Sequence, residues 1–100
     1  MIERDSDTTY DTDGLNEIFA ALSDPTRRDI VERLRLESMN VSAIASEYDA
    51  SLAAVAKHVA LLEEAGLVYK RKQGKERIVS LIPTAFARAA GYMDQFGPTT

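Results

Sequence analysis

The chain has 100 residues, of which 45% are hydrophobic and 28% are charged, the composition of one ordinary globular domain. It contains no cysteine, which excludes disulfides, thiolate nucleophiles and thiolate metal sites. No apolar run approaches the roughly 20 residues needed to cross a bilayer, and the acidic N-terminal segment lacks the apolar core of a secretory signal. We therefore expect a cytoplasmic protein without membrane association.

The net charge of -4 is unevenly distributed along the chain. Residues 1–13 hold five acidic residues against Arg4 alone, an excess equal to the net charge of the whole chain. We expect this segment to be a disordered, solvated arm; an autoinhibitory mimic of DNA is the alternative. The segment from Lys57 to Arg77 has the opposite character, with six basic residues against three acidic ones. Such a basic cluster is typical of a nucleic-acid contact.

Residues 14–97 are predicted to form one folded domain that begins with three helices. Apolar residues spaced i, i+3, i+4 and i+7 mark one face of the first helix; they are Leu15, Ile18, Phe19 and Leu22. Asp24 and Pro25 suit the N-cap and first position of a second helix, because proline needs no N–H donor there. Asn40 is a suitable cap for a short third helix, in which Tyr48 is predicted to face inward.

A longer fourth helix and a hairpin follow. Ser51 is a natural N-cap for the fourth helix, which spans about 51–65. Its predicted buried face comprises Leu52, Val55, Ala56, Val59, Leu62 and Ala65. Residues 67–73 and 76–82 then read as two strands around Gly74-Lys75, a turn signal. Pro83 is predicted to end the second strand, before a last helix.

The order of these elements predicts the fold class. A short helix, a tight turn and a longer helix make a helix-turn-helix. A basic hairpin directly after the longer helix is a wing. The sequence therefore predicts a winged helix-turn-helix, mostly α with a small β-hairpin.

Several segments resemble the ArsR (ArsR/SmtB) family of transcriptional regulators. Residues 21–30, ALSDPTRRDI, are similar to its Leu-x-Asp-Pro-Thr-Arg-x-x-Ile opening, and residues 62–68, LEEAGLV, to its junction of recognition helix and wing. Residues 41–45 resemble its positioning helix, and Gly74, Lys75 and Arg77 its wing tip. The resemblance covers about residues 15–96. It implies a homodimeric repressor whose fourth helix enters the major groove of double-stranded DNA.

The resemblance also implies that the first and last helices form the dimer interface. Burying Phe86, Met93 and Phe96 is worth about 1.5–3 kcal/mol each, a sum comparable to the whole stability of a small domain. We therefore expect a partner surface to cover this stripe; packing on the parent core is the alternative. The predicted interface residues are Leu15, Ile18, Phe19, Leu22, Phe86, Ala89, Ala90, Met93 and Phe96.

The predicted DNA-binding residues lie near the start of the fourth helix and on the hairpin. Alanine and leucine cannot distinguish bases by hydrogen bonds, so Lys57 and His58 are the main candidates for base contacts. Phosphate contacts and DNA shape would supply the rest. Helix propensity explains the alanines equally well, and His58 has an alternative role as an ordinary surface residue. The predicted set is Ser42, Ser51, Leu52, Ala53, Ala54, Lys57, His58, Lys70, Arg71, Lys72, Lys75 and Arg77.

Neither metal sensing nor catalysis is expected. Asn40 and Ser42 match positions of a cysteine site in the family, and the last helix has Asp94 but no histidine. We predict no metal and no cofactor; a small organic effector, a protein partner or no effector remain open. A phosphate-binding glycine loop is missing, and a nucleophile would depend on one histidine. The alternative to DNA binding is a winged-helix module that dimerises or docks on a partner without reading DNA.

Overall fold

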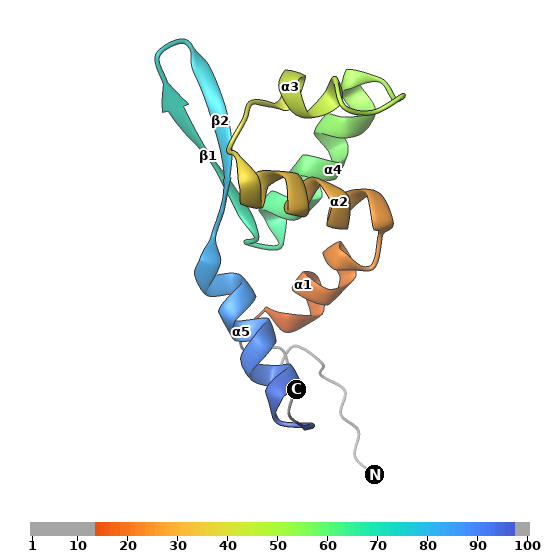
Figure 1. The fold of residues 1–100 in the computed structure, drawn as a ribbon, viewed down its shortest axis with the longest axis vertical. Coiled ribbons are helices and arrows are strands. Elements are labelled where there is room, and N and C mark those ends of the chain that lie inside the picture. Colours follow the sequence, from red (N-terminus) through yellow and green to blue (C-terminus); the bar gives the residue numbers. More distant parts are fainter. Residues whose placement is uncertain (1–13, 98–100) are drawn as a thin grey trace.

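The computed structural model describes residues 14–97, so the predicted acidic arm, 1–13, lies outside the described residues (Figure 1). The order of elements and the fold class are confirmed: the fold is mostly helical, with one two-stranded antiparallel hairpin. The elements are α1 (Leu15–Leu22), α2 (Pro25–Leu36), α3 (Val41–Ala45), α4 (Leu52–Glu64), β1 (Val68–Gln73), β2 (Glu76–Leu81) and α5 (Pro83–Asp94). No helix in this part of the chain is long and apolar enough to cross a membrane.

Local signals start the helices where the sequence predicts. The side chains of Asp24, Asn40 and Ser51 each accept a hydrogen bond from the backbone N–H three residues further on, over 2.8–3.0 Å. Each bond satisfies one of the N–H groups that the first turn of a helix leaves without a partner. Pro83, predicted only to end the second strand, also occupies the first turn of α5.

The wing is a tight hairpin anchored at its root. Gln73 pairs with Glu76 across a two-residue turn, and Gly74 takes φ of 64° there, a conformation that favours glycine. At the other end of the hairpin, Val79 and Met39 exchange two backbone hydrogen bonds of 2.9 and 3.3 Å. The root of β2 therefore has β1 on one edge and the α2–α3 linker on the other.

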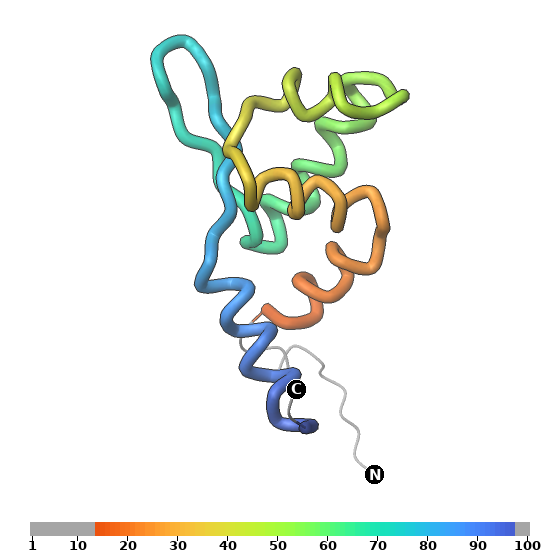
Figure 2. The backbone as a smooth tube through the Cα atoms, viewed as in Figure 1, coloured from red at the N-terminus to blue at the C-terminus, as the bar shows by residue number. Residues whose placement is uncertain are grey.

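The core lies where helices α1 to α4 meet the root of the wing. The largest fully buried side chains are Ile18, Ile30, Ile44, Val55, Val59, Leu62, Leu67, Val68 and Val79. Among the described residues of α5, only Ala85 is buried. The later turns of α5 extend from the body of the molecule, and α1 lies beside the helix (Figures 1 and 2).

Two predicted placements of apolar residues are wrong. Ile18, predicted in the dimer interface, is 0% exposed, because α1 contacts α2, α4 and α5 and directs Ile18 into the core of its own protomer. Leu52, predicted on the buried face of α4, is 54% exposed. It is the first residue of α4 and precedes the turns that pack on the core.

Candidate nucleic-acid interface

Helices α3 and α4 form the helix-turn-helix. The outward face of α4 carries one lysine among alanines. The buried face of α4, with Val55 and Val59, packs on the core. On the opposite face Ala53, Lys57 and Ala60 are exposed, as expected for residues spaced three and four apart. Lys57 thus extends from the centre of the outward face. Ser51 and Ala54, also predicted to contact DNA, are exposed at the same end of the helix.

Strand pairing divides the cations of the wing between two faces. Residues directly opposite each other point to the same side of an antiparallel pair. Lys70 pairs with the core residue Val79, and Lys72 pairs with Arg77, so these three cations share the side of the hairpin that faces the core. Arg71 points to the other side. The predicted wing cations are therefore not one cluster.

The cations on the core side of the wing meet the start of α3 across a groove. This groove has a volume of about 330 Å³. Its lining residues are Asn40, Val41 and Ser42 on one wall and Lys70, Lys75, Glu76 and Arg77 on the other. The Nδ2 group of Asn40 donates a 2.8 Å hydrogen bond to Oε1 of Glu76 across it. The structure thus brings the predicted residue Ser42 together with three of the predicted wing cations.

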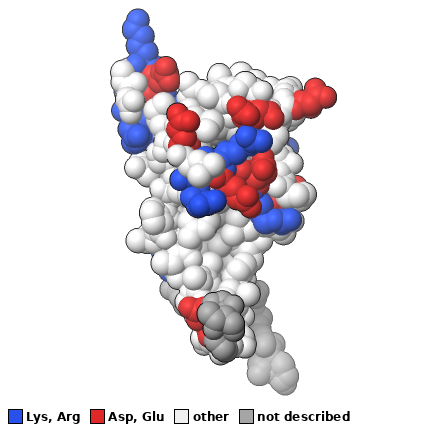
Figure 3. Space-filling view, in the orientation of Figure 1, with Lys and Arg blue, Asp and Glu red and all other residues white. Residues whose placement is uncertain are grey.

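Most of these cations have no acidic partner. The Lys70 ammonium lies 3.7 Å from Oε1 of Glu63, an exposed ion pair of small energetic value. Within residues 14–97, Lys57, Lys72, Lys75 and Arg77 form no ion pair. Figure 3 shows basic side chains at the tip of the wing and a second group over α2 that is mixed with acidic side chains, whereas the surface where α5 begins carries few charges. Basic residues without an adjacent acidic partner therefore occupy the wing, whereas those of α2 lie among acidic residues.

His58 is not on the outward face of α4. Its imidazole is half-buried, with Nδ1 at 3.3 Å from Nη1 of Arg27 and 3.9 Å from Oδ2 of Asp24. It lies about 100° around the helix from Lys57 and faces the start of α2. The predicted outward placement of His58 is therefore wrong. The pKa of Asp24 is lowered, first by the hydrogen bond from the backbone N–H of Arg27 and further by the positive charge of the Arg27 side chain.

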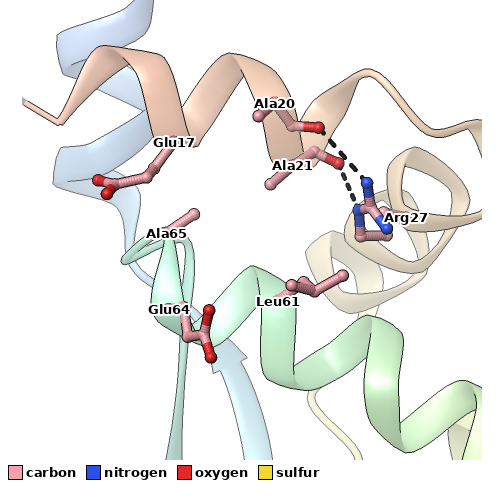
Figure 4. A pocket seen from close by; sticks show the side chains of 7 residues that line it. All are labelled: Glu17, Ala20, Ala21, Arg27, Leu61, Glu64 and Ala65. Atoms are coloured by element: carbon pink, nitrogen blue, oxygen red, sulfur yellow. Dashed lines mark hydrogen bonds between the residues drawn. The ribbon is translucent and has the colours of Figure 1, made fainter. Parts of the chain in front are cut away.

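Arg27 joins three helices at this point. Its Nε donates a 2.7 Å hydrogen bond to the carbonyl of Ala21, and Nη2 donates to the carbonyl of Ala20 at 3.4 Å, both at the end of α1. The guanidinium closes one end of a small pocket between α1 and α4, of about 150 Å³ (Figure 4). The carboxylates of Glu17 and Glu64 lie toward the other end.

A second polar network fixes the helix-turn-helix against α2. Arg33 donates to Oδ2 of Asp29 at 2.9 Å and to Oε1 of Glu47 at 3.1 Å, and the Tyr48 hydroxyl donates to Asp29 at 2.5 Å. Tyr48, predicted inside the third helix, lies beyond its end. The hydrogen bond from Tyr48, followed by that from Arg33, lowers the pKa of Asp29. Burial first, and Asp29 second, raise the pKa of Tyr48.

At the opposite end of the molecule, α1 and α5 expose a row of aromatic rings. The ring centroids of Phe19 and Tyr92 are 5.8 Å apart, and those of Tyr92 and Phe96 are 5.2 Å apart. Phe96 is 73% exposed and Met93 is 56% exposed. Tyr92 was missing from the predicted interface; the only signal was its position four residues before Phe96.

The predicted interface set is divided by the structure. Phe19, Ala90, Met93 and Phe96 are exposed, whereas Leu15, Leu22, Phe86 and Ala89 are half-buried. Of the half-buried members, Leu22, Phe86 and Ala89 pack against the core. The first turns of α5 therefore pack on the core of their own protomer, which was the alternative to a dimer interface. The exposed apolar residues of α5 begin further along the helix. Within the described residues, no three His, Asp or Glu side chains are grouped as metal ligands would be.

Comparison with known proteins agrees with this architecture. Residues 22–71 match the model of a helix-turn-helix domain family. The chain is 40% identical over 76 residues to the HTH-type transcriptional regulator Rv2034 of Mycobacterium tuberculosis, across 76% of this chain and 71% of that protein. The structure of an ArsR-like transcriptional regulator from Rhodococcus sp. RHA1 is similar, with a TM-score of 0.79, 32% identity, and coverage of 91% of this chain and 84% of that one.

A more distant structure shares the fold alone. It is the homodimeric winged helix-turn-helix DNA-binding domain of Mb0332 from Mycobacterium bovis, with a TM-score of 0.71 and 20% identity. The similarity covers 100% of this chain and 96% of that domain. With the family model, the curated relative and the closely superimposable ArsR-like structure in agreement, this chain belongs to the ArsR family of winged helix-turn-helix transcriptional regulators.

Proposed function

We propose that this chain represses transcription as a homodimer that binds double-stranded DNA, with α4 in the major groove and the wing on the phosphate backbone. The observation that carries the proposal is the division of the molecule into two ends. The wing tip, α3 and the start of α4 lie at one end, and α1 and the exposed part of α5 lie at the other (Figure 1). Unpaired cations occupy the first end and exposed aromatic rings the second.

The charges of the wing support a polyanionic partner. Lys72 and Arg77 stand directly opposite each other on one face of the hairpin, and like charges in that position destabilise a strand pair. A phosphate placed between them would replace repulsion by two attractive contacts. The exposed rings of α5 support dimerisation, because a homodimer buries the same patch from both copies.

The outward face of α4 favours one competing function. It exposes Ala53 and Ala60, with Leu52 and Leu61 at its margins, and this surface would suit a protein partner as well as a DNA groove. We retain a protein-docking module as the second candidate.

Gel retardation separates the two functions. The full chain is mixed with duplex DNA from the region upstream of its own gene, at about 50 and 200 mM salt, with unlabelled random-sequence DNA as competitor. We expect a retarded complex that random DNA does not displace and that weakens at the higher salt. Absence of a complex at both salt concentrations would refute the proposed function and leave the protein-docking module.

A further inference from the structure

We propose that His58 is a positioning residue for DNA recognition: through Arg27, it fixes the rotation of α4 relative to the end of α1, and thereby aims Lys57. This inference rests on the proposed function, because it concerns how the recognition helix is held. The contact that carries it is the 3.3 Å approach of Arg27 Nη1 to His58 Nδ1.

The chemistry of this contact defines the state of the histidine. An arginine side chain has five donors and no acceptor. The contact is therefore a hydrogen bond only when Nδ1 of His58 carries no proton and accepts from Arg27. Arg27 is itself held in place, since its backbone N–H donates to Asp24 at 3.0 Å and its Nε donates to the carbonyl of Ala21 at 2.7 Å. Arg27 thus connects His58 to two fixed points at the start of α2 and the end of α1.

The core cannot provide the same directional restraint. Val55, Val59 and Leu62 hold α4 by apolar contacts, which are not directional and tolerate small rotations of a helix about its axis. His58 lies on the flank of the helix, between this buried face and the outward face. A hydrogen bond at that flank resists rotation in a way that the apolar face does not.

A small rotation would have a large effect at the DNA. The ammonium of an extended lysine lies about 10 Å from the axis of its helix, so a rotation of about 15° moves it by roughly 2–3 Å. Hydrogen bonds to base edges tolerate only a few tenths of an ångström around about 2.9 Å. Loss of the restraint should therefore reduce the preference of Lys57 for one base while leaving phosphate attraction intact.

Two substitutions of His58 distinguish positioning from folding. His58→Asn keeps an acceptor oxygen close to the place of Nδ1, whereas His58→Leu has similar bulk and no acceptor. The probes are the 30-base-pair duplex that the wild-type protein selects from a random pool, and a random-sequence duplex of equal length. For His58→Leu we expect about tenfold weaker binding of the selected duplex and less than about twofold change with random DNA. His58→Asn should bind both within about threefold of wild type.

Arg27→Met provides a second route to the same contact. It should reduce the ratio of specific to non-specific affinity at least as much as His58→Leu does, because it also removes the hydrogen bonds to the end of α1. The double variant should show no further loss beyond Arg27→Met, because the contact with His58 is already absent. Circular dichroism melting of each variant confirms that it folds. If His58→Leu does not fold, Arg27→Met is used for the comparison instead.

The inference is overturned if a folded His58→Leu keeps the wild-type ratio, or if His58→Asn loses as much as His58→Leu. Either result leaves the proposed function intact. A wild-type protein that selects no duplex from the pool refutes the proposed function itself, and this inference with it.

Discussion

The two arginines of the wing allow a paired test of which face of the hairpin meets DNA. Arg77 lies on the core side, in the groove beside α3, and Arg71 lies on the other side, where its Nη1 donates to Oε1 of Gln73 at 2.7 Å. Substituting either by glutamine removes the same charge from the same hairpin. Only Arg77→Gln should weaken DNA binding substantially.

The magnitude follows from counting unpaired cations. On α4 and on the turn and core side of the wing, Lys57, Lys72, Lys75 and Arg77 form no ion pair with a described residue, so a dimer would neutralise about eight phosphates with these four cations per protomer. The slope of log affinity against log salt should then be about -7 for wild type and about -5 for Arg77→Gln. Between 50 and 200 mM salt, affinity should fall about ten-thousandfold for wild type and about a thousandfold for the variant.

Fluorescence anisotropy with a labelled duplex, titrated at four or five salt concentrations, measures these slopes. Arg71→Gln should keep the wild-type slope. Arg77→Gln should also raise the melting temperature of the free protein slightly, because it relieves repulsion with Lys72. Equal slopes for the two variants would refute the assignment of the core-side face to DNA.

Three further predictions concern assembly and stability. Phe96→Ser should weaken dimerisation at least a hundredfold, as measured by analytical ultracentrifugation, because burying a ring that is 73% exposed contributes roughly 3 kcal/mol. Leu36→Ser changes a similarly exposed leucine on α2 and should leave dimerisation unchanged. The pKa of Asp29 is lowered in the folded state, so its stabilising effect is present above pH 4 and is lost as pH falls through the folded pKa. Thermal melts from pH 7 to pH 3 should show Asp29→Asn less stable at neutral pH, with the difference from wild type narrowing as the pH falls. A constant difference would contradict this. Gly74→Ala should lower stability by about 1 kcal/mol, because Gly74 has a φ of 64° that alanine adopts unfavourably. Gly91→Ala should raise stability, because Gly91 lies in a helix with open space around it. Calorimetry that finds the same sign of change for both variants would exclude this argument from backbone conformation.

The sequence predicts this fold well because the caps and turns that bound its elements depend on residues close together in sequence. The caps at Asp24, Asn40 and Ser51 each act on a backbone group three residues away, so a short window of sequence contains both partners. The turn at Gly74 likewise depends on one dihedral angle. Alternation along the two strands places the wing cations on both faces of the hairpin, although it does not say which face is turned to α3.

The site residues that sequence reasoning misplaced depend on distant neighbours. Ile18 and Phe19 are adjacent on one apolar stripe, and only the packing of α1 decides that the first enters the core while the second stays 37% exposed. His58 is three residues after the buried Val55, a spacing that puts it on the flank of α4, but its partner Arg27 is 31 positions away in sequence. Tyr92 joins the aromatic row because α1 brings Phe19 to it. Helical periodicity does not identify these distant partners.

The backbone bridge between Met39 and Val79 has a practical consequence for redesign. It clamps the base of the hairpin from the side opposite β1, whereas the tip beyond Lys72 is held by its own turn and by one side-chain hydrogen bond, from Asn40 to Glu76. Foreign loops of different length could therefore be grafted between Gln73 and Glu76 without disturbing the helices. The length of duplex that the wing contacts could then be changed without altering the recognition helix α4.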